Sequence, residues 1–118
     1  MLVLEPNKGF LRKADKKELY EAIYILTMLI PIGKVTTYKS IAKVLGVHPR
    51  LVGIALKKNK KPIIIPCHRV ISSDGSIRGY SVGGKNVKKK LLEIEGVRII
   101  GEKVDPKYII DISEQLIS

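Results

Sequence analysis

Two short amphipathic segments separated by a glycine turn constrain the fold of this 118-residue chain more than any other feature. Thr37 is a preferred helix N-cap residue, and Gly46 can end that helix in the left-handed conformation. Pro49 suits the first turn of the helix that follows. Apolar residues recur at helical spacing in both segments, at Ile41, Ala42, Val44 and Leu45 and at Leu51, Val52, Ala55 and Leu56. The pattern predicts a helix-turn-helix, which many small helical proteins contain without binding DNA.

The segment before this pair also predicts a helix. Asp15 and Glu18 have the spacing of a capping box, and the apolar residues behind them keep helical spacing as far as Ile30. That helix should end before Pro31. Residues 1–15 show no strong hydrophobic period, and we expect a short N-terminal arm there, followed by one domain over residues 16–118.

The segments after the pair are shorter. Three isoleucines between two prolines at residues 62–66 predict a buried extended strand that leads to Cys67. We expect a turn at residues 72–75, a helix from Asn86 to Glu95, an extended piece at 97–104 and a terminal helix at 106–116. The fold class is therefore mainly α: a small, winged-helix-like domain whose cysteine lies on a short extended or hairpin segment.

The charge of the chain is strongly positive. Twenty-two Lys and Arg residues against eleven Asp and Glu residues give a net charge of +11, which favours a nucleic-acid partner. A lysine-rich surface of the kind found in heat-adapted proteins is the alternative, and Lys88, Lys89 and Lys90 are expected on a solvated face. The lysines are not confined to one amphipathic helix, no apolar run approaches about 18 residues, and no signal peptide is evident. We expect an intracellular, cytoplasmic protein that does not bind membranes.

The single cysteine, Cys67, lies in the run Pro66-Cys67-His68-Arg69-Val70. One Cys and two His residues allow no internal disulfide and no zinc site without carboxylates, so no metal is expected. A neighbouring imidazole or guanidinium can favour the nucleophilic thiolate. On a strand, however, His68 would point away from Cys67, so it would need a turn or a bridging water to act on the thiol. A small buried cysteine beside a surface His-Arg pair is the alternative.

The cysteine run closely resembles the active-site signature of O6-alkylguanine-DNA alkyltransferases. The resemblance extends from about Leu19 to Gly96, and its parts keep the order and spacing of the family. They are residues 32–38 (IGKVTTY), 50–55 (RLVGIA), Asn59, Pro62, the Cys67 run, 79–81 (GYS) and 91–96 (LLEIEG). We therefore interpret the chain as similar to this family.

The resemblance implies the roles of the reactive residues. Cys67 would accept an alkyl group from guanine O6, and His68 would act as its base through a water. Glu95 would orient the imidazole. Tyr38 would lie beside a phosphate and donate to guanine N3, and Arg50 would fill the gap left by a flipped nucleotide.

The resemblance also implies the binding residues. The substrate pocket would be formed by Pro66, Val70, Tyr80 and Ser81, and DNA contacts would come from Thr37, Tyr38, Arg50, Lys57, Asn59 and Arg69. Asn59 would in addition brace the turn before the cysteine segment. The recognition helix would enter the minor groove of double-stranded DNA that contains O6-alkylguanine. We expect a monomer that needs no cofactor.

Two departures from the family leave alternatives. Family members usually carry a sizeable N-terminal domain, whereas about eighteen residues precede the first family-like helix here. The loop at residues 81–85 is also one residue longer than usual, so the preferred alkyl size stays open. Short alkyltransferase-like proteins bind alkylated DNA without repairing it and recruit other repair factors, but they typically replace the cysteine. A plain helix-turn-helix regulator is the third alternative.

Overall fold

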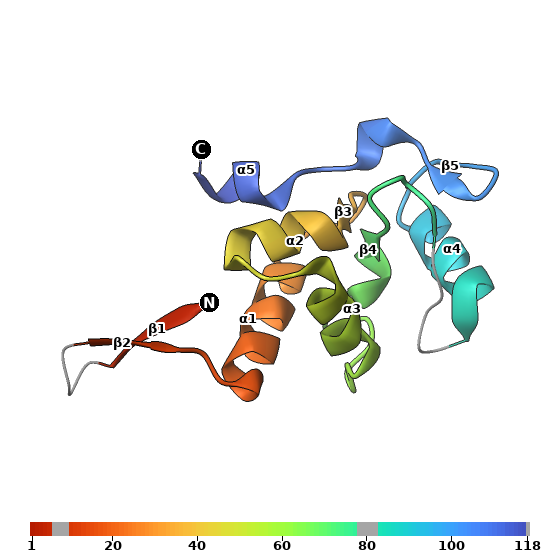
Figure 1. The fold of residues 1–118 in the computed structure, drawn as a ribbon. Coiled ribbons are helices and arrows are strands. Elements are labelled where there is room, and N and C mark those ends of the chain that lie inside the picture. Colours follow the sequence, from red (N-terminus) through yellow and green to blue (C-terminus); the bar gives the residue numbers. More distant parts are fainter. Residues whose placement is uncertain (6–9, 78–82, 118) are drawn as a thin grey trace.

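Three helices pack against one another at the centre of the molecule: α1 (Lys16–Met28), α2 (Tyr38–Leu45) and α3 (Pro49–Lys57) (Figure 1). The structure is a computed structural model that describes residues 1–5, 10–77 and 83–117. Both members of the predicted capping box make their hydrogen bonds at the start of α1. Thr37 caps α2, and Gly46 ends it with a φ of 68°. The mainly α fold and the helix-turn-helix are therefore confirmed.

Two apolar clusters meet at a short parallel strand pair, β3 (Thr36–Thr37) and β4 (Val70–Ile71). Val70 belongs to the cluster formed with the three central helices, and Ile71 belongs to the second cluster, under α4 (Gly84–Ile94). Adjacent residues of a strand point to opposite faces, so this one pair joins the two clusters. Cys67, at the edge of the first cluster, is held close to this junction.

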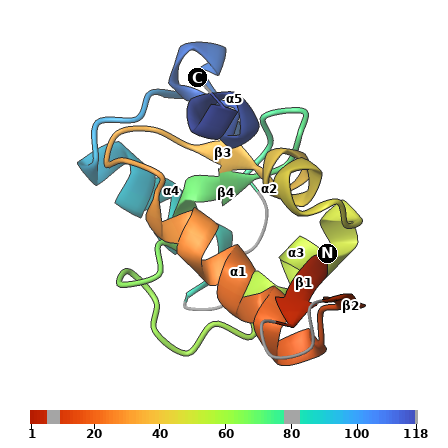
Figure 2. The ribbon, with the colours of Figure 1, turned by 90° about the vertical axis from the view of Figure 1, so that its left-hand side faces the viewer.

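The C-terminal segment runs back across the start of the domain. The hairpin of β5 (Ile99–Ile100) and β6 (Lys103–Val104) leads into a 3₁₀ turn at Pro106–Tyr108. Val35 then exchanges backbone hydrogen bonds with Tyr108 and Ile110 over 2.9 and 2.8 Å, and only α5 (Ile112–Ile117) is helical again. Figure 2 shows β3 and β4 between α1 on one side and α5 on the other. The predicted helix at 106–116 is wrong in its first half, because the backbone there pairs with Val35.

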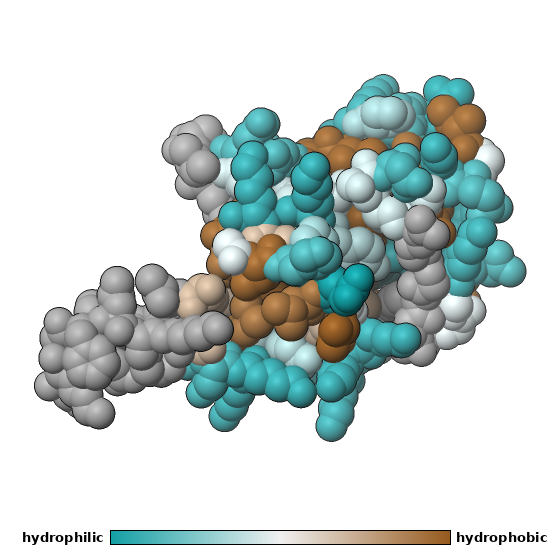
Figure 3. Space-filling view, viewed as in Figure 1, coloured by the Kyte–Doolittle hydropathy of each residue, from teal (hydrophilic) through white to brown (hydrophobic). Residues whose placement is uncertain are grey.

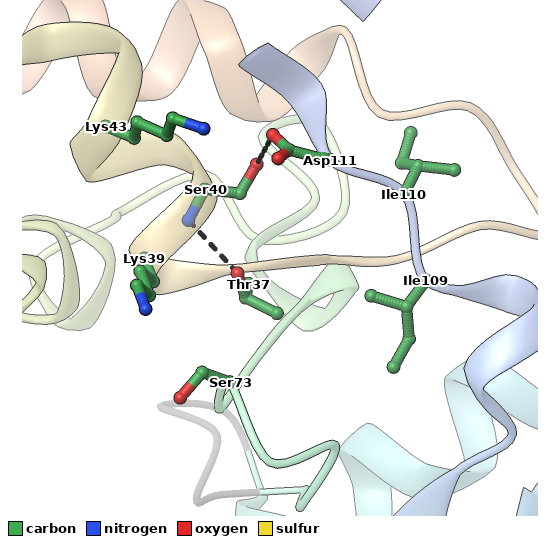
Figure 4. Close-up of a pocket in the computed structure, with 8 residues that line it drawn as sticks. All are labelled: Thr37, Lys39, Ser40, Lys43, Ser73, Ile109, Ile110 and Asp111. Carbon is green, nitrogen blue, oxygen red and sulfur yellow. Dashed lines mark hydrogen bonds between the residues drawn. The ribbon is translucent and has the colours of Figure 1, made fainter. Parts of the chain in front are cut away.

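Asp111 fastens this C-terminal segment to α2. The Ser40 hydroxyl donates to its carboxylate over 3.0 Å and accepts from the Ile112 N–H over 2.8 Å. Figure 4 shows Asp111 pointing from the C-terminal segment toward Ser40, with Lys39 and Lys43 on the same helix. Residues 109–112 thereby complete the surface beside the first turn of α2.

Two other sequence expectations change. The N-terminal arm contains an antiparallel hairpin, β1 (Leu2–Glu5) with β2 (Phe10–Lys13), which projects from the helical body (Figure 1). Helix α4 is capped by Gly83 and not by Asn86. Gly83 has a φ of 87°, and a Cβ there would collide with Val87. The start of α4 is therefore set by the left-handed backbone at Gly83 and by the lack of room for a side chain there. Side-chain capping preferences do not include either effect.

Candidate functional site

Cys67 lies on a 3₁₀ turn, Cys67–Arg69, that leads directly into β4. The turn closes through hydrogen bonds from the Cys67 N–H to the Ile65 carbonyl and from the Arg69 N–H to the Pro66 carbonyl, over 2.7 and 2.9 Å. A 3₁₀ turn has three residues per turn, so Cys67 and His68 are not forced onto opposite faces. Cys67 is 6% exposed. The predicted need for a turn at this point is met.

The segment before Cys67 is a turn and not the predicted buried strand. Ile63 has a φ of 75°, which is costly for a β-branched residue, and Ile63 and Ile64 are exposed. The two prolines remove N–H donors that a strand would use for pairing. The Asn59 side chain compensates, donating to the Ile65 carbonyl and accepting from the Lys61 N–H, both over 2.9 Å. Asn59 is buried, so its predicted bracing role fits its contacts and its predicted DNA contact does not.

A carboxylate links the two residues that follow the cysteine. Glu95, at the C-terminal end of α4, lies 3.1 Å from His68 Nε2. It also accepts two hydrogen bonds from Arg69, over 2.9 and 2.7 Å, and the third guanidinium nitrogen donates to the Ile30 carbonyl. Arg69 is thus turned into the protein, and its predicted contact with DNA stays a prediction that this orientation does not favour. An anion at a helix C-terminus is unfavourable, and these partners explain why Glu95 is tolerated there.

The network controls the charge of the imidazole. Burial lowers the pKa of His68, and the attraction of Glu95 does not fully offset this. Burial would raise the pKa of Glu95, but the hydrogen bonds from Arg69 and His68 outweigh it and the pKa is lowered. At neutral pH the arrangement therefore holds a carboxylate beside a neutral imidazole. A neutral imidazole can accept a proton from a neighbouring thiol.

Lys88 is the functional candidate that the sequence analysis missed. It is only 1% exposed and lies on the inner face of α4, whereas Lys90 is exposed. Its Nζ lies 5.8 Å from the centre of the Tyr38 ring. Burial lowers its pKa to about 8, against an opposing attraction from Cys67. The expectation that residues 88–90 form a solvated face is wrong at Lys88. The apolar spacing of Lys88 with Leu91 and Leu92 was the available signal.

The helix-turn-helix presents the other predicted residues beside this site. Tyr38 is the first residue of α2 and is half-buried, and Thr37 caps that helix. Arg50 and Lys57 are exposed on α3, seven residues and therefore about two turns apart on one face. Figure 3 shows a hydrophobic strip over α2 and α3, bordered by hydrophilic side chains. Val44 and Ile54 are exposed members of these helices.

The predicted pocket residues are only partly described. Pro66 and Val70 are buried on either side of the 3₁₀ turn. Tyr80 and Ser81 lie outside the described residues, so their predicted roles stay predictions. None of the helices in the described ranges has the length and hydropathy that a membrane-spanning helix requires.

Comparison with known proteins decides the family. Residues 18–97 match the family described as 6-O-methylguanine DNA methyltransferase, DNA binding domain. The chain belongs to this family. A methylated-DNA--protein-cysteine methyltransferase of Pyrobaculum aerophilum is 46% identical over 106 residues, which are 86% of this chain and 66% of the relative. The protein of the same name from Saccharolobus solfataricus is 56% identical over 78 residues, which are 66% of this chain and 50% of the relative.

Solved structures of the family have the same fold. S. pombe Atl1 in complex with damaged DNA containing O6-carboxymethylguanine matches with a TM-score of 0.74 at 34% identity, covering 82% of this chain and 98% of Atl1. The O6-methylguanine-DNA methyltransferase of Pyrococcus kodakaraensis matches with a TM-score of 0.61 at 49% identity, covering 67% of this chain and 46% of that protein. The chain therefore spans about half to two thirds of the named methyltransferases and nearly all of Atl1.

Proposed function

We propose that this protein repairs duplex DNA by transferring the alkyl group of O6-alkylguanine to Cys67 in a single turnover. The observation that carries the proposal is Cys67 on its 3₁₀ turn, followed by a buried His68 that lies 3.1 Å from Glu95. A cysteine that served only as a small apolar residue would need no such imidazole–carboxylate pair. Methyltransferases with the same domain at 46–56% identity support this reaction class.

The reaction is a displacement at the alkyl carbon. The Cys67 sulfur forms a bond to that carbon as the carbon–O6 bond breaks, and the electron pair of the broken bond stays with guanine. The thiol proton passes to His68, and the imidazole returns to its neutral form when this proton is relayed to the leaving guanine, so that the thiol and the O6-alkylguanine give a thioether and guanine. Because Nε2 faces the ionised Glu95, it carries the N–H of a neutral imidazole, and Nδ1 is the nitrogen that accepts the proton. The thioether product has no ready hydrolytic route back, which makes the protein a single-use reagent.

Access to O6 requires a flipped nucleotide, because the atom is buried in the base stack. The proposed flipping residue is Arg50, which is exposed at the start of α3 and can support the orphan base. Arg50→Ala should slow repair of duplex DNA about tenfold or more, equivalent to about 1.4 kcal/mol. The deficit should shrink on free O6-benzylguanine, which needs no extrusion. Equal impairment on both substrates would contradict the flipping role.

Mass spectrometry tests the proposal directly. Excess DNA containing O6-methylguanine should add a single methyl group to the peptide that contains Cys67, and nothing to the Cys67→Ser variant. Repeated turnover, or no mass shift from a protein that binds the DNA, would contradict it.

A second function, binding alkylated DNA without transfer, is favoured by one observation. The chain covers 98% of Atl1, which was solved with O6-carboxymethylguanine DNA. The presence of Cys67 with its His68–Glu95 pair favours transfer over binding alone. The methyl-transfer experiment separates the two, because a binding-only protein would hold the DNA and gain no mass. Under either function, we expect the protein to act on chromosomal DNA and to bind the minor groove as a monomer.

A further inference from the structure

Helix α1 is apolar on an outer face as well as on the face that packs into the core. Its buried face includes Ile23, Leu26 and Thr27. Large apolar side chains that are 56, 47, 53 and 73% exposed follow one another on the outer face and in the turn after the helix: Ile25, Met28, Leu29 and Ile32. Figure 2 shows α1 at the front of the molecule. A surface helix normally has one apolar face, so the second one indicates a binding surface.

This apolar surface continues onto the end of α4. The turn after α1 lies against that end, because a Cβ added to Gly33 would be 3.3 Å from the Glu95 carbonyl oxygen. Ile94, the last residue of α4, is 74% exposed. The ends of the two helices therefore lie side by side, and together they form an α1 surface that consists of Ile25, Met28, Leu29, Ile32 and Ile94.

The longest uncharged stretch of the chain underlies the α1 surface. Residues 22–33 contain no Asp, Glu, Lys or Arg, although the whole chain has a net charge of +11. A DNA backbone needs cations that this stretch does not supply, whereas the centres of protein interfaces are depleted in charged residues. Copies of a strongly positive protein repel one another, and this repulsion is weakest where two uncharged surfaces meet.

The two ends of the uncharged stretch carry opposite charges. Glu21 is exposed four residues before Ile25, on the same face of α1, and Lys34 follows the stretch directly. When two copies of α1 pack antiparallel, Glu21 of each copy approaches Lys34 of the other copy. The two-fold axis then passes near Met28, about midway between these two charges. The α1 surface is therefore complementary to itself in charge as well as in apolar character.

We propose that the α1 surface is a dimerisation surface through which two copies of the free protein pack α1 against α1. Apolar side chains would fill the centre of the interface, and the Glu21–Lys34 pairs would lie at its polar rim. Helix α3 packs against another side of α1, where the Tyr24 hydroxyl donates to the Ala55 carbonyl over 2.7 Å. The α3 residues that are proposed to contact DNA are not part of the α1 surface, so each copy can still bind one lesion by itself.

Sedimentation velocity without DNA, over a range of protein concentrations, tests this proposal. Wild type should approach the mass of two chains as its concentration rises. Met28→Glu brings two carboxylates together at the two-fold axis and should raise the dissociation constant of the dimer about tenfold or more. Ile100→Glu, at an isoleucine of β5 that is 58% exposed, is the matched control and should dimerise like wild type. Wild type that is monomeric at about 1 mM, or Met28→Glu that dimerises like wild type, would overturn the proposal.

Crosslinking locates the contact. With Cys67→Ser as the background, oxidation by diamide should join two copies of Met28→Cys through a disulfide, because the two-fold axis brings both copies of residue 28 together. Ile100→Cys should not crosslink. The opposite result would place the interface elsewhere and overturn the proposal. These measurements use neither alkylated DNA nor the reactive thiol, so a failure of methyl transfer would contradict the proposed function and leave the dimer intact.

Discussion

At the scale of single residues, two cations that look alike in sequence have opposite tasks. Arg69 forms an ion pair with Glu95 and donates a hydrogen bond to the Ile30 carbonyl, so its charge is paired inside the protein. Lys88 has no ion pair with a carboxylate among the described residues, and its Nζ lies 5.8 Å from the centre of the Tyr38 ring. The difference lies in partners and not in the type of residue.

Lys88 should make the stability of the protein depend on alkaline pH. Its pKa is lowered from 10.5 to about 8, so the unfolded chain binds more protons between these values and unfolding becomes harder as pH rises through this window. The difference corresponds to about 3 kcal/mol. Urea unfolding of wild type between about pH 7 and pH 10.5 should show this rise, and Lys88→Met should lack it. The same rise in Lys88→Met would contradict the assignment.

Arg69→Met should destabilise the protein by about 2–3 kcal/mol, because it leaves Glu95 in a largely enclosed site without its strongest partner. The pKa of Glu95 is lowered in the folded state, so the stability that it contributes is present above about 4.5 and is lost as pH falls through the folded value. Chemical unfolding as a function of pH should show a smaller acid-side loss in Arg69→Met. Combining it with Glu95→Gln should recover part of the stability, and strict additivity would show that the pair is not coupled.

At the scale of elements, the two glycines of the helix-turn-helix differ in what they require. Gly46 ends α2 with a φ of 68°, whereas Gly53 lies within α3 without a positive φ, and neither has an atom within 4 Å of an added Cβ. Gly46→Ala should therefore cost about 1 kcal/mol through backbone strain alone. Gly53→Ala should stabilise the protein by about 0.5–1 kcal/mol. Thermal unfolding measures both, and opposite signs are expected.

Gly53→Ala also tests the proposed interface. Gly53 lies three residues after Arg50, so the two share a face of α3. If that face enters a DNA groove, an added methyl group should weaken DNA binding in a protein that is more stable than wild type. Unchanged affinity would place the groove contact on another face.

The attachment of the C-terminal segment depends on one hydroxyl. Ser40→Ala removes the bond to Asp111 and leaves the buried N–H of Ile112 without its acceptor. We expect a loss of about 1–3 kcal/mol and faster proteolytic cleavage after residue 105. Ser73→Ala is the control, because Ser73 is exposed and lines the same surface pocket as Ser40 and Asp111. Equal cleavage of wild type and Ser40→Ala would show that the backbone pairing with Val35 suffices.

At the scale of the whole molecule, two properties should be independent: DNA affinity, which the net charge of +11 favours, and alkyl transfer by Cys67. The cysteine turn and the exposed face of α3 are separate parts of the structure. DNA affinity should fall with salt by a log–log slope of about −0.9 for each phosphate neutralised. Cys67→Ser should abolish transfer and keep this affinity and slope, because Arg50 and Lys57 lie on α3 and not on the cysteine turn. Fluorescence anisotropy at several salt concentrations measures both. Loss of binding in a folded Cys67→Ser protein would show that the two regions are not separate.

The sequence by itself determined the structural features that depend only on neighbouring residues along the chain. The capping box of Asp15 and Glu18, the Thr37 cap and the Gly46 terminus each need only a few adjacent residues, and each was predictable. The order of the motifs likewise indicated the family before any geometry was known.

Tertiary structure alone decided the features that depend on distant partners. The first half of residues 106–116 is not α-helical because the Tyr108 carbonyl and the Ile110 N–H bond to the backbone of Val35. The charge of Lys88 predicts a surface position, whereas the packing of α4 against the cysteine turn buries its side chain. Hydrogen bonds and burial between segments far apart in sequence outweigh local propensity at these positions, and the reactive site is assembled from them.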